Sequence, residues 1–419
     1  MPCPYTQPYF SALLSPPSPM IAQLKPFPRQ PVLPGYDLPP VPQTGTRVIL
    51  LRHGRSTLND AGCYQGSTDT SYLTPAGTAA SKVVGRYLAY CPIDAVYASP
   101  LKRVQQTVAT LMPQLKVPLL RDVMTTPLLK EIHLPAWEGR RYADVRSHDA
   151  DRYHCWQAQP EQLQMTAAGA ANNVPFYPVR DVYQRAQQFW ETTLPQHLGE
   201  TMLVVGHGGS NQALINTALG LSPHHHHALQ QTHSGLTVLD FASPADRAAK
   251  LHVLNTTVSD RLPKLKAGKQ GLRLLLLPCH PNAPKQPEIA AFLKGETIDA
   301  AIVEESAAAS RSRETLQTAD AALPHNPATV MLSVQQMQLS QQWPAAIRRS
   351  LTTYDHEHLT TLLVVAPTES LQAGFQSLLG LPETAATPQL RAHSLSVIHY
   401  AKTQPQPILQ GLNLVPLQP

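Results

Sequence analysis

The chain has 419 residues, which is long enough for two or three domains and for a core that needs no disulfide bonds. Its formal net charge of +5 is small for this length, and Lys and Arg form no block, so the charge argues against nucleic-acid binding and stays compatible with small anionic substrates. The five cysteines are scattered and odd in number, and no apolar run approaches the roughly 18 residues of a membrane span. These properties predict a cytoplasmic protein that contacts neither membrane nor nucleic acid.

Residues 1–45 are dense in proline and show no hydrophobic period, which predicts a disordered, extended tail. The apolar stretch at 10–14 is short, follows no basic residue and runs into Pro16-Pro17, which argues against a secretory signal. Because the first acidic residue is Asp37, a transit peptide stays open as an alternative.

Strand and helix patterns alternate from residue 46 onward. A continuous apolar run at 48–51 predicts a strand buried on both faces, and Thr74-Pro75 opens a helix to about Tyr90. Further strands are expected at 95–97, 117–120, 202–205 and 236–241, and further helices at 100–111 and 211–219. This alternation predicts an α/β fold with a mainly parallel sheet and helices on both faces, in which ligands gather beyond the carboxyl ends of strands.

Two further segments lack this pattern. Residues 140–180 are rich in Gln, Ala and Asn and are predicted to form an insertion or lid. Residues 245–270 contain several lysines and show no clear period, which is typical of an inter-domain linker.

An internal repeat links the two halves of the chain. Five short segments recur in the same order: 47–51 as 273–277, 93–95 as 298–300, 203–205 as 363–365, 218–223 as 378–382, and 233–238 as 393–397. The repeat predicts a duplicated fold. The expected domains are a tail at 1–45, a catalytic domain at 46–244, a linker at 245–270, a shorter second domain at 271–403 and a C-terminal tail at 404–419.

The second copy does not repeat the chemistry of the first. Ungapped alignment places Pro278 opposite Arg52, Cys279 opposite His53, Met337 opposite Glu131 and Pro367 opposite His207. We therefore expect a degenerate, inactive second domain that serves stabilisation or dimerisation, and a homodimer is possible.

Reactive side chains occur in four short patches of the first copy: Arg52-His53-Gly54, Ser99 to Arg103, Glu131, and Gly206-His207-Gly208. Two arginines, two histidines and a carboxylate suit phosphoryl transfer through a histidine, because guanidinium groups stay charged and offer forked donors to phosphate.

The residue types suggest a role for each group. His53 is the expected nucleophile, with its other ring nitrogen donating to a backbone carbonyl, and Gly54 allows close backbone approach. His207 would stabilise charge on the phosphoryl oxygens. Glu131 would protonate the leaving group and then take a proton from water, with Glu138 as its rival.

These patches resemble the histidine phosphatase superfamily, which includes phosphoglycerate mutases and many phosphomonoesterases. The chain is similar to its pattern at Arg52 to Asn59, Gln65-Gly66, Asp69 and Leu73-Thr74 with Gly77. The resemblance covers roughly residues 46–241, and a weaker similarity continues to about residue 402. It implies that Asn59, Gln65 and Gly66 line the substrate phosphate, and it favours Glu131 over Glu138, because Trp137-Glu138-Gly139 matches the structural end of the acidic motif. Gly54 and Gly208 are also expected in the substrate-binding site.

Two residues depart from the family pattern. Cys63 stands where the family often has an arginine, which puts in doubt strong binding of a second anionic group such as a carboxylate, and Pro135 replaces a usual glycine. The run His224 to His227 has no carboxylate or cysteine nearby, so no metal and no cofactor are expected.

The leading hypothesis is a metal-independent phosphatase that hydrolyses a small sugar or sugar-acid phosphate through a phosphohistidine. The Arg55-Ser56-Thr57 variant and the two-unit layout resemble phosphatases acting on 2-carboxyarabinitol 1-phosphate. A phosphoglycerate mutase and a non-catalytic, phosphate-binding regulatory protein are the alternatives.

Overall fold

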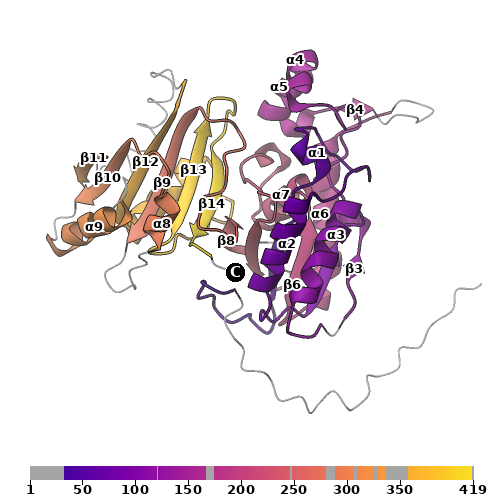
Figure 1. Ribbon diagram of the computed structural model, residues 1–419, viewed down its shortest axis with the longest axis horizontal. Coiled ribbons are helices and arrows are strands. Elements are labelled where there is room, and N and C mark those ends of the chain that lie inside the picture. The colour runs from indigo at the N-terminus through magenta and orange to yellow at the C-terminus, as the bar shows by residue number, and fades with distance from the viewer. Residues whose placement is uncertain are drawn as a thin grey trace, which may run out of the picture.

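One mixed sheet runs through both halves of the chain in the computed structural model (Figure 1). The structure describes residues 33–119, 121–166, 174–245, 248–279, 288–305, 309–323, 329–335 and 357–417. The sheet has twelve strands in the order β11-β10-β12-β9-β13-β14-β8-β7-β1-β6-β2-β3. Their bounds are β1 Thr46–Arg52, β2 Ala95–Ala98, β3 Met124–Thr125, β6 Thr201–Gly206, β7 Leu236–Phe241, β8 Lys250–Thr256, β9 Gly271–Cys279, β10 Ala300–Glu305, β11 Val330–Gln335, β12 Leu359–Pro367, β13 Leu395–Ala401 and β14 Ile408–Leu414.

The first half forms the α/β arrangement that the sequence predicts. β1, β6, β2 and β3 are parallel, and β7 is antiparallel to β1. Side chains of β1 alternate between the two faces. Val48 and Leu50 pack with α6 Pro178–Thr193 and α7 Gly208–Ala218, whereas Ile49 and Leu51 pack with α2 Pro75–Tyr87 and α3 Lys102–Leu111. The predicted fold class is therefore confirmed.

Most of the predicted elements are present with small shifts at their ends. Helix α2 begins after Thr74, whose side chain accepts a hydrogen bond from the Gly77 amide, and it ends at Tyr87 rather than Tyr90. The helix expected from Asn211 already begins at Gly208.

The strand predicted at 117–120 is wrong for the described residues 117–119, which have no strand structure. Pro118 has no N–H to donate to a ladder, and the place beside β2 is taken by β3.

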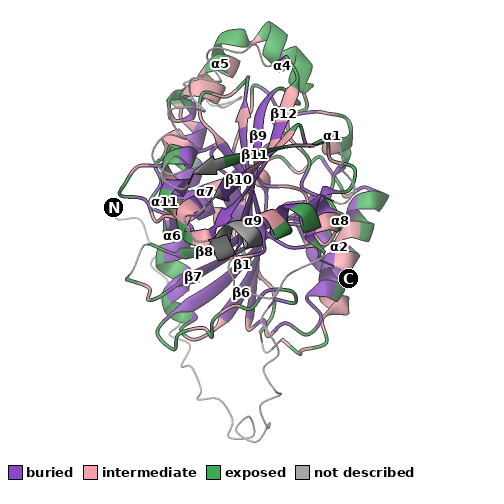
Figure 2. Ribbon diagram, turned by 90° about the vertical axis from the view of Figure 1, so that its left-hand side faces the viewer, coloured by how far each residue is buried: buried purple, intermediate pink, exposed green. Residues whose placement is uncertain are grey.

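Shorter elements surround the site. They are α1 Thr57–Asp60, η2 Met112–Gln114, η3 Pro127–Leu129, α4 Tyr142–His148, α5 Ala150–Ala158, η4 Pro160–Gln162, β4 Met165–Thr166, β5 Pro175–Phe176, η5 Leu194–Gln196 and η6 Pro223–His225. The segment predicted as an insertion or lid contains α4 and α5, which project from one end of the molecule with largely exposed surfaces (Figure 2).

The second half repeats the strand order of the first. β9, β12, β10 and β11 are parallel, β13 is antiparallel to β9, and β14 is antiparallel to β13. The corresponding strands in the first half are β1, β6, β2, β3, β7 and β8. Helices α8 Ile289–Leu293 and α9 Ala309–Ala322 lie on one face, and α11 Thr368–Leu379 lies on the other.

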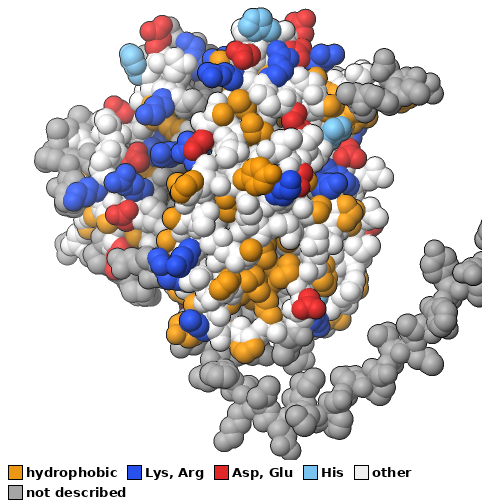
Figure 3. All heavy atoms as spheres, turned by 45° about the vertical axis from the view of Figure 1, so that its right-hand side comes forward, with side chains coloured by type: hydrophobic (Ala, Val, Ile, Leu, Met, Phe, Trp, Pro, Cys, Tyr) orange, Lys and Arg blue, Asp and Glu red, His pale blue; other side chains and the backbone are white. Residues whose placement is uncertain are grey.

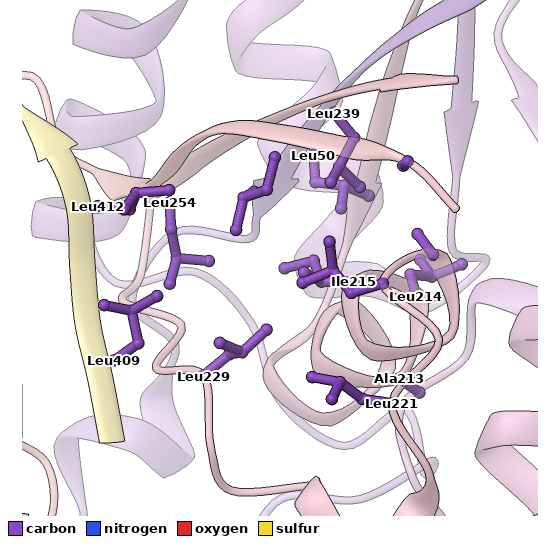
Figure 4. Close-up of a cluster of buried hydrophobic side chains, with 14 of the residues drawn as sticks. Leu50, Ala213, Leu214, Ile215, Leu221, Leu229, Leu239, Leu254, Leu409 and Leu412 are labelled. Atoms are coloured by element: carbon purple, nitrogen blue, oxygen red, sulfur yellow. The ribbon is translucent and has the colours of Figure 1, made fainter. Parts of the chain in front are cut away.

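The two halves meet at β8 and β14, which pair antiparallel. Leu254 of β8 and Leu409 and Leu412 of β14 belong to the same buried cluster as Leu50 of β1 and Leu229 (Figure 4). The core is therefore continuous across the junction.

This junction corrects two sequence expectations. The segment 245–270, predicted as a linker, contains β8, and the segment 404–419, predicted as a tail, contains β14. Both strands contain buried polar residues, among them Asn255 and Gln410. Because of these polar residues, the sequence pattern of each strand resembles that of a connecting segment.

The predicted disordered tail is also wrong for residues 33–45. Leu33 and Tyr36 are buried, the Tyr36 hydroxyl donates to Thr256 Oγ1 over 3.1 Å, and Arg47 Nη2 donates to the Pro39 carbonyl over 2.7 Å. Residues 1–32 lie outside the described residues.

The surface shows mixed charge. In the view of Figure 3, Lys and Arg side chains are interspersed with Asp and Glu over the face shown. Among the described residues, no helix has the length and apolar character needed to cross a membrane.

Candidate active site

The carboxyl ends of three neighbouring strands bring the predicted residues together. Arg52 at the end of β1 pairs with Gly206 at the end of β6, and the His53 amide donates to the Gly206 carbonyl over 3.0 Å. The amide of Ser99, just after β2, donates to the carbonyl of Val205 over 3.1 Å. The side chains that follow β1, β6 and β2 therefore converge at one edge of the sheet.

His53 is fully buried at this edge. Its Nδ1 lies 2.7 Å from the Gly54 carbonyl, which can only accept, so Nδ1 carries the proton. Burial, followed by the charges of Arg52 and Arg103, lowers the pKa of His53 well below its usual range. The imidazole is therefore neutral at neutral pH, and Nε2 has a free lone pair.

His207 is the second buried histidine. Its ring centroid lies 5.2 Å from that of His53, and its Nε2 lies 2.7 Å from Ser99 Oγ. Burial and then the Arg103 charge lower the pKa of His207 well below its usual range.

Two guanidinium groups stand beside the histidines. Arg103 is fully buried, donates from Nη2 to the Gly66 carbonyl over 2.8 Å, and keeps a pKa of about 10 despite its burial, so it is charged at neutral pH. Arg52 donates from Nη1 to the Gln231 carbonyl over 2.8 Å. Backbone carbonyls therefore fix the orientation of both guanidinium groups.

One nitrogen of each of these four residues is buried without a hydrogen-bond partner among the described residues. The atoms are Arg52 Nε, His53 Nε2, Arg103 Nε and His207 Nδ1. Buried polar atoms in native proteins are nearly always paired. The two guanidinium nitrogens and His207 Nδ1 can donate to the acceptor oxygens of an anion, whereas His53 Nε2 presents its lone pair to an electrophile.

Glu131 is buried next to this group. Its Oε1 accepts from the amides of Ile132 and Ser210 over 2.9 and 3.0 Å, and its Oε2 accepts from the Gly209 amide over 3.1 Å. The carboxylate therefore sits at the N-terminus of α7, directly after His207.

The rival carboxylate, Glu138, is used elsewhere. Its Oε1 accepts from the Gly66 amide over 3.0 Å and from Thr68 Oγ1 over 2.5 Å. Glu138 thus holds the 66–68 loop, whereas Glu131 lines the cavity described below.

The predicted substrate-binding residues divide into two groups. Asn59, Gln65 and Gly208 line a cavity of about 310 Å³. Of the predicted catalytic residues, Arg52 and Glu131 line the same cavity, whereas the fully buried His53, Arg103 and His207 do not. At Gly208 a Cβ would lie 3.3 Å from Arg52 Cζ, so glycine makes room for the guanidinium.

Gly54 and Gly66 do not line the cavity. A Cβ at Gly54 would lie 2.6 Å from the Gly77 carbonyl of α2, so this glycine allows close packing of the helix. The Gly66 amide and carbonyl are already engaged by Glu138 and Arg103.

The cavity contains groups that sequence reasoning did not assign to the site. Five of its seven amide side chains are among them: Gln157, Gln212, Gln230, Gln231 and Gln404. Lys266 also lines it, from beyond the predicted catalytic domain.

His233 is a further missed neighbour, with its ring centroid 5.8 Å from that of His53. Antiparallel pairing of β7 with β1 brings it there, since the Ser234 amide donates to the Arg52 carbonyl over 3.1 Å. A sequence signal existed in the recurring segment 233–238, but the pairing partner of β7 was not evident from it.

Of the histidine run at 224–227, His226 and His227 line the cavity. His227 Nε2 lies 2.8 Å from the Trp156 carbonyl, and His226 packs against Trp156 and Tyr183. No group of His, Cys, Asp and Glu within the described part of the chain is arranged to hold a metal ion.

Known proteins match the first half of the chain. A family model described as histidine phosphatase superfamily (branch 1) matches residues 48–254. The 2-carboxy-D-arabinitol-1-phosphatase of Triticum aestivum is 33% identical over 246 residues, which are 58% of this chain and 47% of that protein. The 2,3-bisphosphoglycerate-dependent phosphoglycerate mutase of Rhodococcus jostii is 31% identical over 201 residues, which are 43% of this chain and 78% of that protein.

Among solved structures, a phosphoserine phosphatase of Entamoeba histolytica in complex with 3-phosphoglyceric acid matches with a TM-score of 0.42 and 24% identity, over 51% of this chain and 98% of that one. The chain spans about half the length of the two 2-carboxy-D-arabinitol-1-phosphatase relatives, 47% and 48%.

Proposed function

The chain belongs to the histidine phosphatase superfamily, and from this membership we propose that it is a metal-independent phosphatase that hydrolyses a small phosphomonoester through a phosphohistidine at His53. The observation that carries the proposal is the set of four unpaired buried nitrogens on Arg52, His53, Arg103 and His207. A phosphoryl group supplies acceptor oxygens for the donors of this set and an electrophilic phosphorus for the lone pair of His53.

The first step transfers the phosphoryl group to the protein. Arg52 and Arg103 neutralise the phosphoryl oxygens, and His53 Nε2 attacks phosphorus in line with the leaving oxygen. The P–N bond forms as the P–O bond breaks, and Glu131 gives its proton to the leaving alkoxide. The Gly54 carbonyl holds the Nδ1 proton throughout and keeps the ring in the attacking orientation.

The second step releases phosphate. Glu131, now ionised, takes a proton from a water molecule that attacks phosphorus and breaks the P–N bond, so both the carboxylic acid and the free imidazole are regenerated. The amides of Gly209 and Ser210 steady the carboxylate between the steps.

The substrate is proposed to be a sugar or sugar-acid phosphate. The amide side chains of the cavity both donate and accept hydrogen bonds, which suits hydroxyl groups of either polarity. A relative named 2-carboxy-D-arabinitol-1-phosphatase shares a third of the aligned residues and supports this class.

The second half is proposed to be a degenerate copy that does not catalyse. The repeated strand order supports duplication. Pro278 of β9 pairs with Ala366 of β12 where Arg52 pairs with Gly206, so the strand ends that carry Arg52 and His207 in the first half carry prolines here. Met337, aligned with Glu131, lies outside the described residues.

The mutase alternative rests on the relative from Rhodococcus jostii. It predicts transfer of the phosphoryl group to a second hydroxyl rather than to water. Incubation with 2,3-bisphosphoglycerate and 3-phosphoglycerate, followed by product analysis, separates isomerisation from phosphate release.

The direct test measures phosphate release from p-nitrophenyl phosphate in the presence of EDTA. We expect release by the wild type and its loss in His53→Ala, with the exposed His148→Ala variant as the matched control. Equal background release in the wild type and His53→Ala would contradict the phosphatase and favour a phosphate-binding module.

A further inference from the structure

The catalytic cavity is completed by residues outside the part of the chain that matches the superfamily. The match covers residues 48–254, whereas Lys266, Ala267, Gln404 and Ile408 also line the cavity. Lys266 lies on the segment between β8 and β9, and Gln404 lies between β13 and β14. The second half therefore forms part of the substrate site.

Lys266 is held at the cavity by hydrogen bonds from both halves. The buried Gln230 side chain accepts from the Lys266 amide over 3.2 Å and donates to the Lys264 carbonyl over 3.0 Å. From the second half, Thr403 Oγ1 donates to the Ala267 carbonyl over 3.0 Å. The segment is thus fixed on both sides of Lys266.

Lys266 lines the cavity together with Arg52 and Glu131. Desolvation, followed by the charge of Arg52, lowers the pKa of the Lys266 ammonium well below its usual range, and the Glu131 carboxylate opposes this effect. A bound anion would favour the charged form of Lys266. The side chain is solvent-accessible and makes no hydrogen bond or ion pair with another described residue. The Lys, Arg, Asp and Glu side chains that line the cavity, within the described residues, are Arg52, Glu131 and Lys266. Glu131 is already engaged by three backbone amides, which leaves the basic side chains of Arg52 and Lys266 facing one cavity.

Lys266 supplies a basic side chain to the cavity, whereas the position of Cys63 does not. Superfamily members often carry an arginine at that position, but Cys63 is buried and does not line the cavity. A basic side chain is therefore absent from the loop before Gln65 and present instead on the segment after β8.

We propose that Lys266 binds a second anionic group of the substrate, a carboxylate, while Arg52 and Arg103 hold the phosphoryl group. The inference rests on the proposed phosphatase function and narrows its substrate to phosphorylated hydroxy acids. A carboxylate fits better than a second phosphate, because a single ammonium neutralises one negative charge and the neighbouring groups are neutral amides.

Binding to the full chain in a His53→Ala background tests this without turnover. Two matched ligand pairs differ in the carboxylate: 3-phosphoglycerate with glycerol 3-phosphate, and 6-phosphogluconate with sorbitol 6-phosphate. Calorimetry measures the affinity ratio within each pair. We expect the acid to bind more tightly in at least one pair, and Lys266→Met to reduce that ratio roughly tenfold or more. Lys266→Arg should retain most of the ratio.

The matched control is Lys269→Met, because Lys269 is exposed on the same segment but does not line the cavity. It should leave both affinities unchanged. An affinity ratio that Lys266→Met does not alter, or the absence of any preference for the acids, overturns the inference. A larger loss for fructose 1,6-bisphosphate than for the acids, measured against fructose 6-phosphate, overturns the assignment to a carboxylate. The phosphatase proposal is judged separately, by hydrolysis of p-nitrophenyl phosphate in the wild type.

Discussion

Asn255 of β8 and Asn413 of β14 make the same hydrogen bonds in opposite directions across the junction of the two halves. Asn255 Nδ2 donates to the Gln410 carbonyl over 2.7 Å, and Asn413 Nδ2 donates to the His252 carbonyl over 2.9 Å. Both residues have left-handed backbones, with φ of 58° and 54°. Such reciprocity is expected of two equivalent units related by a two-fold axis, and it supports the interpretation of the chain as a duplicated fold.

Replacement of Asn413 by alanine should destabilise the whole protein. The change leaves the His252 carbonyl without its donor and puts a side chain that disfavours the left-handed region at this φ. We expect a loss of about 1–3 kcal/mol in the free energy of unfolding, measured by urea denaturation. Asn413→Gly removes the hydrogen bonds but relieves the backbone, so it should cost less than Asn413→Ala. An unchanged denaturation midpoint in both variants would show that the side-chain hydrogen bonds of Asn413 do not stabilise the protein.

Replacement of Glu131 by glutamine should separate the two proposed steps. An alkyl phosphate needs a proton on its leaving group, so we expect kcat to fall about 10²-fold or more. p-Nitrophenolate leaves without a proton, so rapid-mixing experiments should show a burst of p-nitrophenol followed by slow turnover. Glu138→Gln is the control, because Glu138 holds the 66–68 loop. This variant should change the rates with the alkyl phosphate and with p-nitrophenyl phosphate by the same factor. Equal losses with both substrates and no burst in Glu131→Gln would contradict the assigned role.

The buried histidines should make stability depend on pH. The pKa of His53 and of His207 is lowered in the folded protein, mainly by burial, whereas in the unfolded chain it is about 6.5. The unfolded chain therefore binds more protons as the pH falls below about 6.5, and the free energy of unfolding decreases there. Each histidine contributes a slope of up to about 1.4 kcal/mol per pH unit.

Urea denaturation between about pH 5 and pH 7 measures this slope. His207→Gln should have a smaller slope than the wild type, whatever its absolute stability. The exposed His148→Gln variant should keep the wild-type slope. Parallel curves for the wild type and His207→Gln would show that His207 does not titrate on unfolding.

Removal of Arg103 should move the acid limb of the activity profile. The Arg103 charge contributes to the low pKa of His53, so its loss raises that pKa and moves the limb to higher pH. We expect Arg103→Gln to lower kcat/KM about 10²–10³-fold and to shift the limb upward, as measured with p-nitrophenyl phosphate. A lower rate with an unshifted limb would mean that Arg103 acts on the substrate alone.

Local patterns in the sequence were sufficient to predict the strands that position Arg52, His53 and His207. The apolar run at 48–51 and the strand at 202–205 each end at a reactive residue, and parallel pairing brings Arg52, His53 and His207 together. The fold class follows from the same alternation of strand and helix.

The features that were missed depend on contacts between distant segments. Asn255 and Gln410 are polar residues buried in β8 and β14. Hydrogen bonds between the two strands, such as that from Asn255 Nδ2 to the Gln410 carbonyl, make this burial possible. Lys266 reaches the cavity because Gln230 and the second half hold its segment in place. Nothing within a short window of residues encodes either relationship.

The pairing of β8 with β14 also determines how the protein can be shortened. A fragment that stopped after β8 would present a row of unsatisfied amide and carbonyl groups at what is now the middle of the sheet. Leu254 and the residues around it would be uncovered at the same time. Such a truncation would favour self-association through this edge, because β14 of the second half covers it in the full chain.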